Sequence, residues 1–212
     1  MRFFVLKYKP GTVFGETEFI TSEPSNVGEA LTCEACGRFI SMLTWLPPYR
    51  VELELWDKCF GDIARGSGNN IIISERFRSL WKEQKLIGLE GFDPVEVVRI
   101  KRHKRFKGDP LQYYRVSVVR SKAIIDQKAS GFEWEEEPTC QECRSGNIIK
   151  RWKRIVLEPN TWSGENIFIA RGLSGTYITD ERFKEFSEEF KIINCNLIPA
   201  EEYARDFYPG QD

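Results

Sequence analysis

Residues 63–77, IARGSGNNIIISERF, recur as residues 169–183, IARGLSGTYITDERF. At a constant offset of 106 residues, eight of the fifteen aligned pairs are identical. Self-similarity at a fixed spacing is typical of a structural unit that occurs more than once. We therefore expect an internal duplication, in which two related units of similar structure make up the chain.

The alignment extends in both directions with shifts of a single residue. Downstream, a Pro-x-Glu sequence recurs at an offset of 105, and upstream the motif CEAC at 33–36 aligns with CQEC at 140–143. The predicted units are residues 1–107 and 108–212. They form either one pseudo-symmetric domain or two docked domains.

Each unit is expected to contain mostly antiparallel strands and one main helix, which is an α+β fold. The opening strands, 2–8 and 113–120, are rich in β-branched and aromatic residues. The helices are expected to begin after Ser74 and Asp180, because both are good N-cap residues. Gly88 is expected to end the first helix.

The two CxxC motifs predict a metal site. A CxxC pair in a tight turn directs both thiols toward one centre, and two such pairs form the four-cysteine ligand set of a structural Zn²⁺. We predict that one shared Zn²⁺ is bound by Cys33, Cys36, Cys140 and Cys143. The alternatives are pairs too far apart to share a metal, redox chemistry at the motifs, and motifs that have lost metal binding. Gly37 follows the first pair but Arg144 follows the second, so the second turn is expected to differ in shape.

Composition indicates the broad class of protein. The 212 residues are 30% charged and 13% aromatic, with a formal net charge of −1, which is typical of a soluble folded chain. Lys7 and Lys9 interrupt the apolar start, and no window approaches the roughly 18 apolar residues of a membrane span. We therefore expect a cytoplasmic protein without membrane association, in which the six cysteines stay reduced.

With CEACG, CQEC and ITDERFKEF in hand, the chain resembles the double-CxxCG motif family, described mainly from myxobacteria. The resemblance covers an opening strand like MRFFVL, one CxxC pair early, one past the middle, and an ERF helix near the end. Members of that family look like bacterial immunity proteins that protect a cell from toxins delivered by its kin. The resemblance implies a role in toxin neutralisation without implying a mechanism.

We predict a non-catalytic binding protein whose partner is a cognate protein toxin. The single histidine, His103, lies in a basic run, and no nucleophile has an evident histidine partner, which argues against an enzyme. Acidic inhibitors are steered quickly onto basic protein surfaces. The candidate partner-binding residues are therefore those of the acidic run, Glu133, Trp134, Glu135, Glu136 and Glu137.

The alternative function is a zinc-stabilised nucleic-acid-binding protein that uses the basic run 99–107. Lysine and arginine would contact phosphates, and Phe106 would stack on a base. Nucleic acid is the less favoured partner, because only one unit carries the run and the overall charge is near neutral. The cations of the run are Arg99, Lys101, Arg102, Lys104, Arg105 and Lys107.

Overall fold

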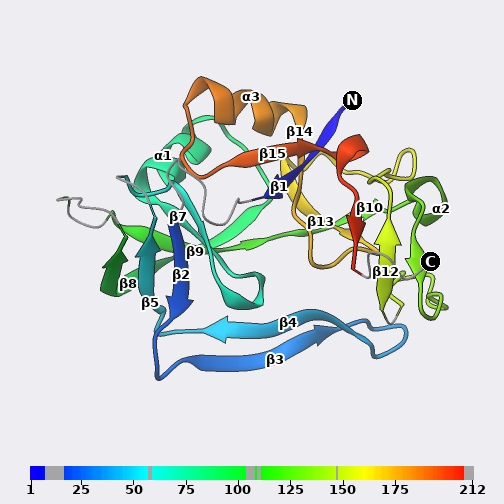
Figure 1. Ribbon diagram of the computed structural model, residues 1–212, viewed down its shortest axis with the longest axis horizontal. Helices are drawn as coiled ribbons and strands as arrows, with labels where there is room; N and C mark the ends of the chain where they lie inside the picture. The colour runs from blue at the N-terminus through cyan, green and yellow to red at the C-terminus, as the bar shows by residue number, and fades with distance from the viewer. Residues whose placement is uncertain (8–16, 57–58, 104–107, 109–110, 147, 208–212) are drawn as a thin grey trace.

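The protein is a mixed α+β structure of mostly strands with three α-helices in its described part, which confirms the expected fold class. Helices α1 (Glu75–Glu83) and α3 (Glu181–Glu189) lie on the same side of the molecule, above the strands in Figure 1. Helix α2 (Gln127–Ser130) is a single turn near the other end. The computed structural model describes residues 1–7, 17–56, 59–103, 108, 111–146 and 148–207.

Six strands close into a barrel in the order β2-β5-β8-β9-β7-β6. Strand β5 alternates buried and partly exposed residues along Arg50–Leu55, which places one of its faces in the core, whereas every residue of β7 is buried. A one-turn 3-10 helix, η1 (Ser67–Asn69), joins two of the strands. The barrel strands are β2 (Thr17–Thr21), β5 (Arg50–Leu55), β6 (Ile63–Arg65), β7 (Ile71–Ser74), β8 (Leu89–Arg102) and β9 (Tyr113–Val118).

A second, five-stranded sheet lies beside the barrel in the order β10-β13-β14-β1-β15. Among the described strands, the pairs β2–β6, β5–β8 and β10–β13 are parallel and the other pairs are antiparallel. The strands of this sheet are β1 (Phe3–Lys7), β10 (Arg120–Ile124), β13 (Ile167–Arg171), β14 (Ile178–Asp180) and β15 (Asn196–Pro199).

Two smaller sheets complete the structure. Strands β3 (Asn26–Thr32) and β4 (Phe39–Leu46) form a long hairpin that runs along the bottom of Figure 1, and we call residues 26–46 the arm. The three-stranded sheet β11-β12-β16 lies at the far end of the molecule. Its strands, and the 3-10 helix that follows β15, are β11 (Glu133–Trp134), β12 (Ile149–Trp152), β16 (Arg205–Asp206) and η2 (Ala200–Glu202).

The opening strand of each predicted unit pairs with strands of the other unit. Strand β1 lies between β14 and β15, where Phe4 is opposite Thr179 on one side and Pro199 on the other. Strand β9 lies between β7 and β8, where Tyr114 is opposite Ile73 and Pro94. Both sheets therefore contain strands from either side of position 107.

The loops next to the helices also connect the two halves reciprocally. The backbone N–H of Asp62 donates to Ile193 O, and Ile193 N–H donates back to Asp62 Oδ2, both at 2.9 Å. In the same way, Asn166 N–H donates to Ile87 O and Ile87 N–H donates to Asn166 Oδ1, both at 2.9 Å. The side chains of Asp62 and Asn166 also hydrogen-bond the N-cap residues of the helices that follow them. Ser74 Oγ donates to Asp62 Oδ1 at 2.7 Å, and Asn166 Nδ2 donates to Asp180 Oδ2 at 2.9 Å.

The helix starts expected from sequence are confirmed. Ser74 Oγ accepts the N–H of Phe77 at 3.1 Å, and Asp180 Oδ1 accepts the N–H of Phe183 at 2.9 Å. The apolar faces of the two helices pack on each other, with Phe77 and Phe186 rings edge to face at 5.5 Å between centroids.

The repeated ERF arginines have a structural explanation. Arg76 donates to the carbonyl of Phe190, the C-cap of α3, and forms an ion pair with buried Asp62. Arg182 Nη2 donates to the carbonyl of Gln84, the C-cap of α1, at 2.6 Å. Each arginine thus satisfies a helix-end carbonyl of the other half, where a positive charge is also favoured by the helix dipole.

The expected end of the first helix at Gly88 is wrong. Helix α1 ends at Glu83 with Gln84 as its C-cap, and Lys85 takes the left-handed conformation at φ 51°. Gly88 serves a different purpose, because a Cβ at this position would lie 2.0 Å from the carbonyl oxygen of Ile167. Its glycine permits the close approach of two backbones from different halves.

Gly88→Ala should therefore destabilise the protein well beyond the cost of its φ of +116°. We expect a loss of about 3 kcal/mol or more, since the Ile167 backbone must move. Gly164→Ala is the control, because Gly164 has φ +104° with nothing within 4 Å, and it should cost about 1–2 kcal/mol. Chemical denaturation of both variants measures the difference, and equal losses would contradict a backbone clash at Gly88.

Candidate metal centre

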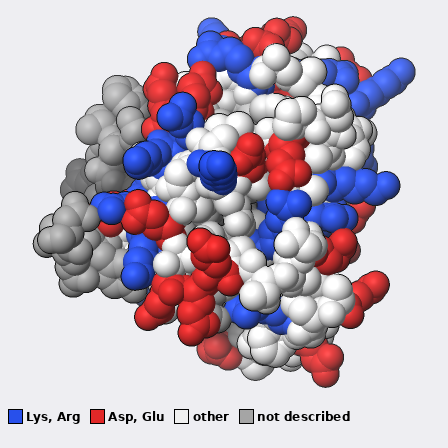
Figure 2. Space-filling model, turned by 90° about the vertical axis from the view of Figure 1, so that its right-hand side faces the viewer, with Lys and Arg blue, Asp and Glu red and all other residues white. Residues whose placement is uncertain are grey.

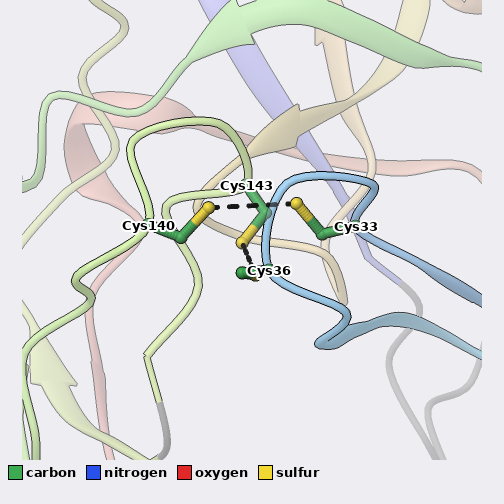
Figure 3. Close-up of side chains that lie close together, drawn as sticks. All are labelled: Cys33, Cys36, Cys140 and Cys143. Carbon is green, nitrogen blue, oxygen red and sulfur yellow. Dashed lines mark hydrogen bonds between the residues drawn. The ribbon is translucent and has the colours of Figure 1, made fainter.

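The structure brings the four predicted cysteines together. Cys33 and Cys36 lie in the turn at the tip of the arm, and Cys140 and Cys143 lie in the connection between β11 and β12 (Figure 3). Their four sulfurs all lie within 4.8 Å of one another. The arm therefore bridges the roughly hundred residues that separate the pairs in sequence.

The sulfur spacing fits a metal site. The Sγ atoms of Cys33 and Cys140 are 3.9 Å apart, and those of Cys36 and Cys143 are 3.7 Å apart. Four sulfurs at about 2.3 Å from a tetrahedral Zn²⁺ would be about 3.8 Å from each other. A disulfide would require about 2.05 Å, and all four thiols are free. The cluster could therefore hold a metal ion.

The two CxxC turns share one backbone geometry. The N–H of Gly37 donates to Cys33 O at 2.7 Å, and the N–H of Arg144 donates to Cys140 O at 3.1 Å. Gly37 has φ 69° and Arg144 has φ 52°, so both are left-handed. The expected difference in shape after the second pair is therefore wrong for this turn.

Neighbouring groups hold Arg144 in a conformation that glycine adopts more easily. Its guanidinium pairs with Glu158 at 2.6 Å, and its carbonyl accepts from Gln127 Nε2 at 2.8 Å. The N–H of Gly172 donates to the adjacent Cys143 carbonyl at 3.0 Å. These contacts offset the conformational cost, which explains how arginine occupies this position.

Crowding of the thiols gives them different acidities. Backbone N–H groups of Cys143 and Glu142 lower the pKa of Cys140 to about 7. The N–H of Arg38 lowers the pKa of Cys36, but burial and the neighbouring thiols raise it to about 12. One thiol thus ionises readily while another resists, which is expected where several negative charges would share one centre. A bound divalent cation would offset the repulsion between the thiolates and favour ionisation of all four.

Charged side chains of both signs, including Glu34 and Glu142, line the space beneath the tip of the arm. A cavity of about 780 Å³ is bounded by Cys33 and Cys143 and by cationic side chains of β10 and β13. Arg120 donates to the carbonyl of Ile40 on the arm, and burial lowers the pKa of Arg120. Arg171 pairs with Glu142 at 3.0 Å. The Arg120 contact fastens the arm to the five-stranded sheet, and the Arg171 contact fastens the second CxxC turn to the same sheet, beside the four cysteines.

Sequence reasoning missed these supporting residues. Arg38, which follows Gly37, donates to the carbonyl of Gly146 at 3.0 Å and ties the two CxxC turns together. Its position directly after the first motif was the only local indication. Arg120 and Arg171 lie far from the motif in sequence, and only the fold brings them to it.

The predicted acidic run lies beside the tip of the arm. Glu133 pairs with Arg151 at 2.8 Å, and Trp134 is half-buried, so these two residues are engaged within the fold. Glu135, Glu136 and Glu137 are exposed. Trp134 lines a cavity of about 320 Å³ together with Phe39 of the arm.

The described part of the basic run is largely paired. Arg99 contacts Glu52 at 3.5 Å, and Lys101 and His103 both contact Glu54 Oε1 at 2.7 Å. Hydrogen bonds from Lys101 and His103 lower the pKa of Glu54. Residues 104–107 of the run lie outside the described residues. Between 99 and 103 the run therefore belongs to a charged ladder on β5 and β8.

No protein-family model matches the chain, and a search of curated proteins found no match. The resemblance to the double-CxxCG motif family stays a prediction from the residues quoted above. Over the described residues, no helix is long and apolar enough to cross a membrane.

Purified protein should contain about one zinc per chain, because four thiolates complete a single tetrahedral site. Cys33→Ser and Cys140→Ser should each remove the metal, since each deletes one ligand from a different turn. Cys59→Ser is the control, because Cys59 is outside the cluster. Elemental analysis with thermal unfolding measures the outcome. Retention of metal and stability by both ligand variants would show that the cluster does not act as one site.

Gly37→Ala isolates the backbone requirement of the first turn. A Cβ there would meet nothing within 4 Å, so only its φ of +69° opposes the change. We expect a loss of about 1–2 kcal/mol of stability. Gly37→Asn should cost less, because asparagine tolerates this conformation. Calorimetry of the metal-loaded variants tests this order, and equal stability of Gly37→Ala and the parent would refute the requirement.

Proposed function

We propose that Cys33, Cys36, Cys140 and Cys143 bind one structural Zn²⁺ that clamps the arm to the other half of the chain. The observation that carries this proposal is the pair of sulfur distances, 3.9 Å and 3.7 Å, between thiols of opposite turns. With four cysteine ligands no coordination position remains for substrate, so the metal supplies rigidity.

An internal duplication is part of the proposal. The repeated segments occupy matching places, and the contacts between them are reciprocal, as with Arg76 and Arg182. Strands β1 and β9 likewise exchange between the halves. Such reciprocity is expected of two related units about an approximate two-fold axis.

We propose that the protein is a non-catalytic immunity protein that neutralises a cognate bacterial toxin by direct binding. The resemblance supports the role, and a metal-fastened arm supports a binding protein, because a rigid surface loses little entropy on association. The ring of His103 contacts Glu54 at 2.7 Å and stacks on Trp56 at 3.8 Å, which supports a structural role for this histidine.

The nucleic-acid alternative has less support. A binding site for phosphates needs cations that are free to replace counterions. Arg99 and Lys101 instead contact Glu52 and Glu54. The face in Figure 2 shows acidic and basic side chains interspersed, in contrast to the broad basic surface expected of such a protein.

Affinity purification of the tagged full chain from its own organism, with a nuclease-treated control, tests the proposed function. We expect a stoichiometric protein partner that inhibits growth when expressed alone and is harmless when expressed with this chain. Cys33→Ser should reduce protection, and Cys59→Ser should retain it. Recovery of nuclease-sensitive nucleic acid in place of a protein would overturn the immunity role.

A further inference from the structure

We propose that the arm is the docking surface of this protein, and that its occupant is a protein with a basic surface and an apolar centre. The inference rests on the proposed function only for identifying that occupant as a toxin. We propose that most of the binding surface lies on the arm, and that the acidic run 133–137, which was predicted from the sequence to bind the partner, lies at the edge of that surface.

The arm carries many of the exposed large apolar side chains of the described chain. Single exposed apolar residues are ordinary, but several on one short hairpin indicate an interaction site. The exposed fractions here range from 39% to 71%. The residues are Val27, Leu31, Phe39, Met42, Leu43 and Leu46.

The fold keeps these side chains out of the core. Strands β3 and β4 pair only with each other among the described strands, so no third described strand extends the arm. At its base, Trp45 is buried and packs on Phe19 and Tyr49, with ring centroids 5.7 Å and 4.9 Å away. The arm is thus anchored at its base by Trp45 of β4, Ile40 is half-buried, and the six residues named above are exposed.

Contacts at the tip hold the arm in one position. Arg38 hydrogen-bonds the Gly146 carbonyl, Arg120 hydrogen-bonds the Ile40 carbonyl, and the cysteine cluster joins both turns. An isolated two-stranded hairpin is marginally stable in water. Fastening both ends therefore pre-organises an apolar surface that would otherwise lose more entropy on binding.

Charge around the arm selects the kind of partner. Glu29 and Glu34 are exposed, whereas the only arm cation, Arg38, donates toward the body of the protein. Four thiolates and one Zn²⁺ would add a net charge of about −2 at the tip. Exposed Glu135 and Glu137 lie near the same end, since neighbouring Trp134 lines a cavity with Phe39.

The lowest part of Figure 2, where the arm lies in Figure 1, is mostly uncharged, with acidic side chains around it and some basic atoms among the uncharged ones. Complementary potentials favour association and disfavour wrong partners. A basic surface therefore fits this border. A second copy of the chain would place acidic groups opposite acidic groups, which argues against the arm as a dimer interface.

A site-specific photo-crosslinker tests the surface in the full chain, expressed in its own organism. The probe replaces Leu43 on the arm or, as the control, Ile87 outside it; the two side chains are 56% and 54% exposed. We expect an adduct with a basic protein from position 43 and none from position 87. An absent adduct at 43, equal adducts at both positions, an acidic partner, or a self-adduct of the chain would each overturn the inference.

Binding measurements with the purified crosslinked protein complete the test. Leu43→Ser should weaken affinity by about tenfold, whereas Ile87→Ser should change it less than about threefold. Glu29→Gln combined with Glu34→Gln should slow association and flatten its salt dependence. Zinc content and thermal unfolding should match the parent in all variants. Unchanged affinity in Leu43→Ser would overturn the inference even if an adduct had formed.

The two proposals fail in different ways. If the Leu43→Ser variant neutralises a toxin and binds it as tightly as the parent does, the immunity role stands and the arm is not the toxin-binding surface. If the arm binds a basic protein that does not inhibit growth, the docking surface stands and the immunity role is wrong.

Discussion

The exchange of opening strands is the constraint on which the rest of the structure depends. Strand β1 completes the five-stranded sheet and β9 completes the barrel, so neither can form from its own half alone. The reciprocal hydrogen bonds of Asp62 and Asn166 then tie the loop before each helix to the segment that follows the helix of the other half. Because these pairings join residues distant in sequence, the cost of ordering the chain is recovered only when both halves are in place.

That locked arrangement explains how a metal site can form across about a hundred residues. The halves hold the connection between β11 and β12 at a fixed place, and the arm carries the first CxxC turn to it. Hydrogen bonds from Arg38 and Arg120 align the turns, so the ligands converge through groups other than the thiols. A ligand set positioned in this way needs little reorganisation to bind a cation.

Local patterns predicted the parts of the fold that depend on local chemistry. The N-caps Ser74 and Asp180 follow from side-chain hydrogen bonding within one turn, and the convergence of the cysteines follows from two motifs of known ligand geometry. The pairing of strands was not predictable in this way. Alternation along a strand shows which of its faces is buried, but it does not show which other strand lies beside it. The same limit hid the role of Gly88, which is set by a carbonyl 79 residues away.

The basic run illustrates a second limit, since the charges of a segment do not reveal what lies opposite them. Arg99 and Lys101 face glutamates because β5 and β8 run parallel with Glu52 opposite Arg99 and Glu54 opposite Lys101. The arm shows the converse, since its apolar residues would be assigned to the core by composition alone and instead remain exposed. An apolar hairpin keeps one shape in water only if it is fastened elsewhere. The buried Trp45 and the cysteine cluster provide that fastening at the base and tip. In the proposed docking role, stability and recognition are separated, because the barrel and sheet supply the first and the exposed arm would supply the second.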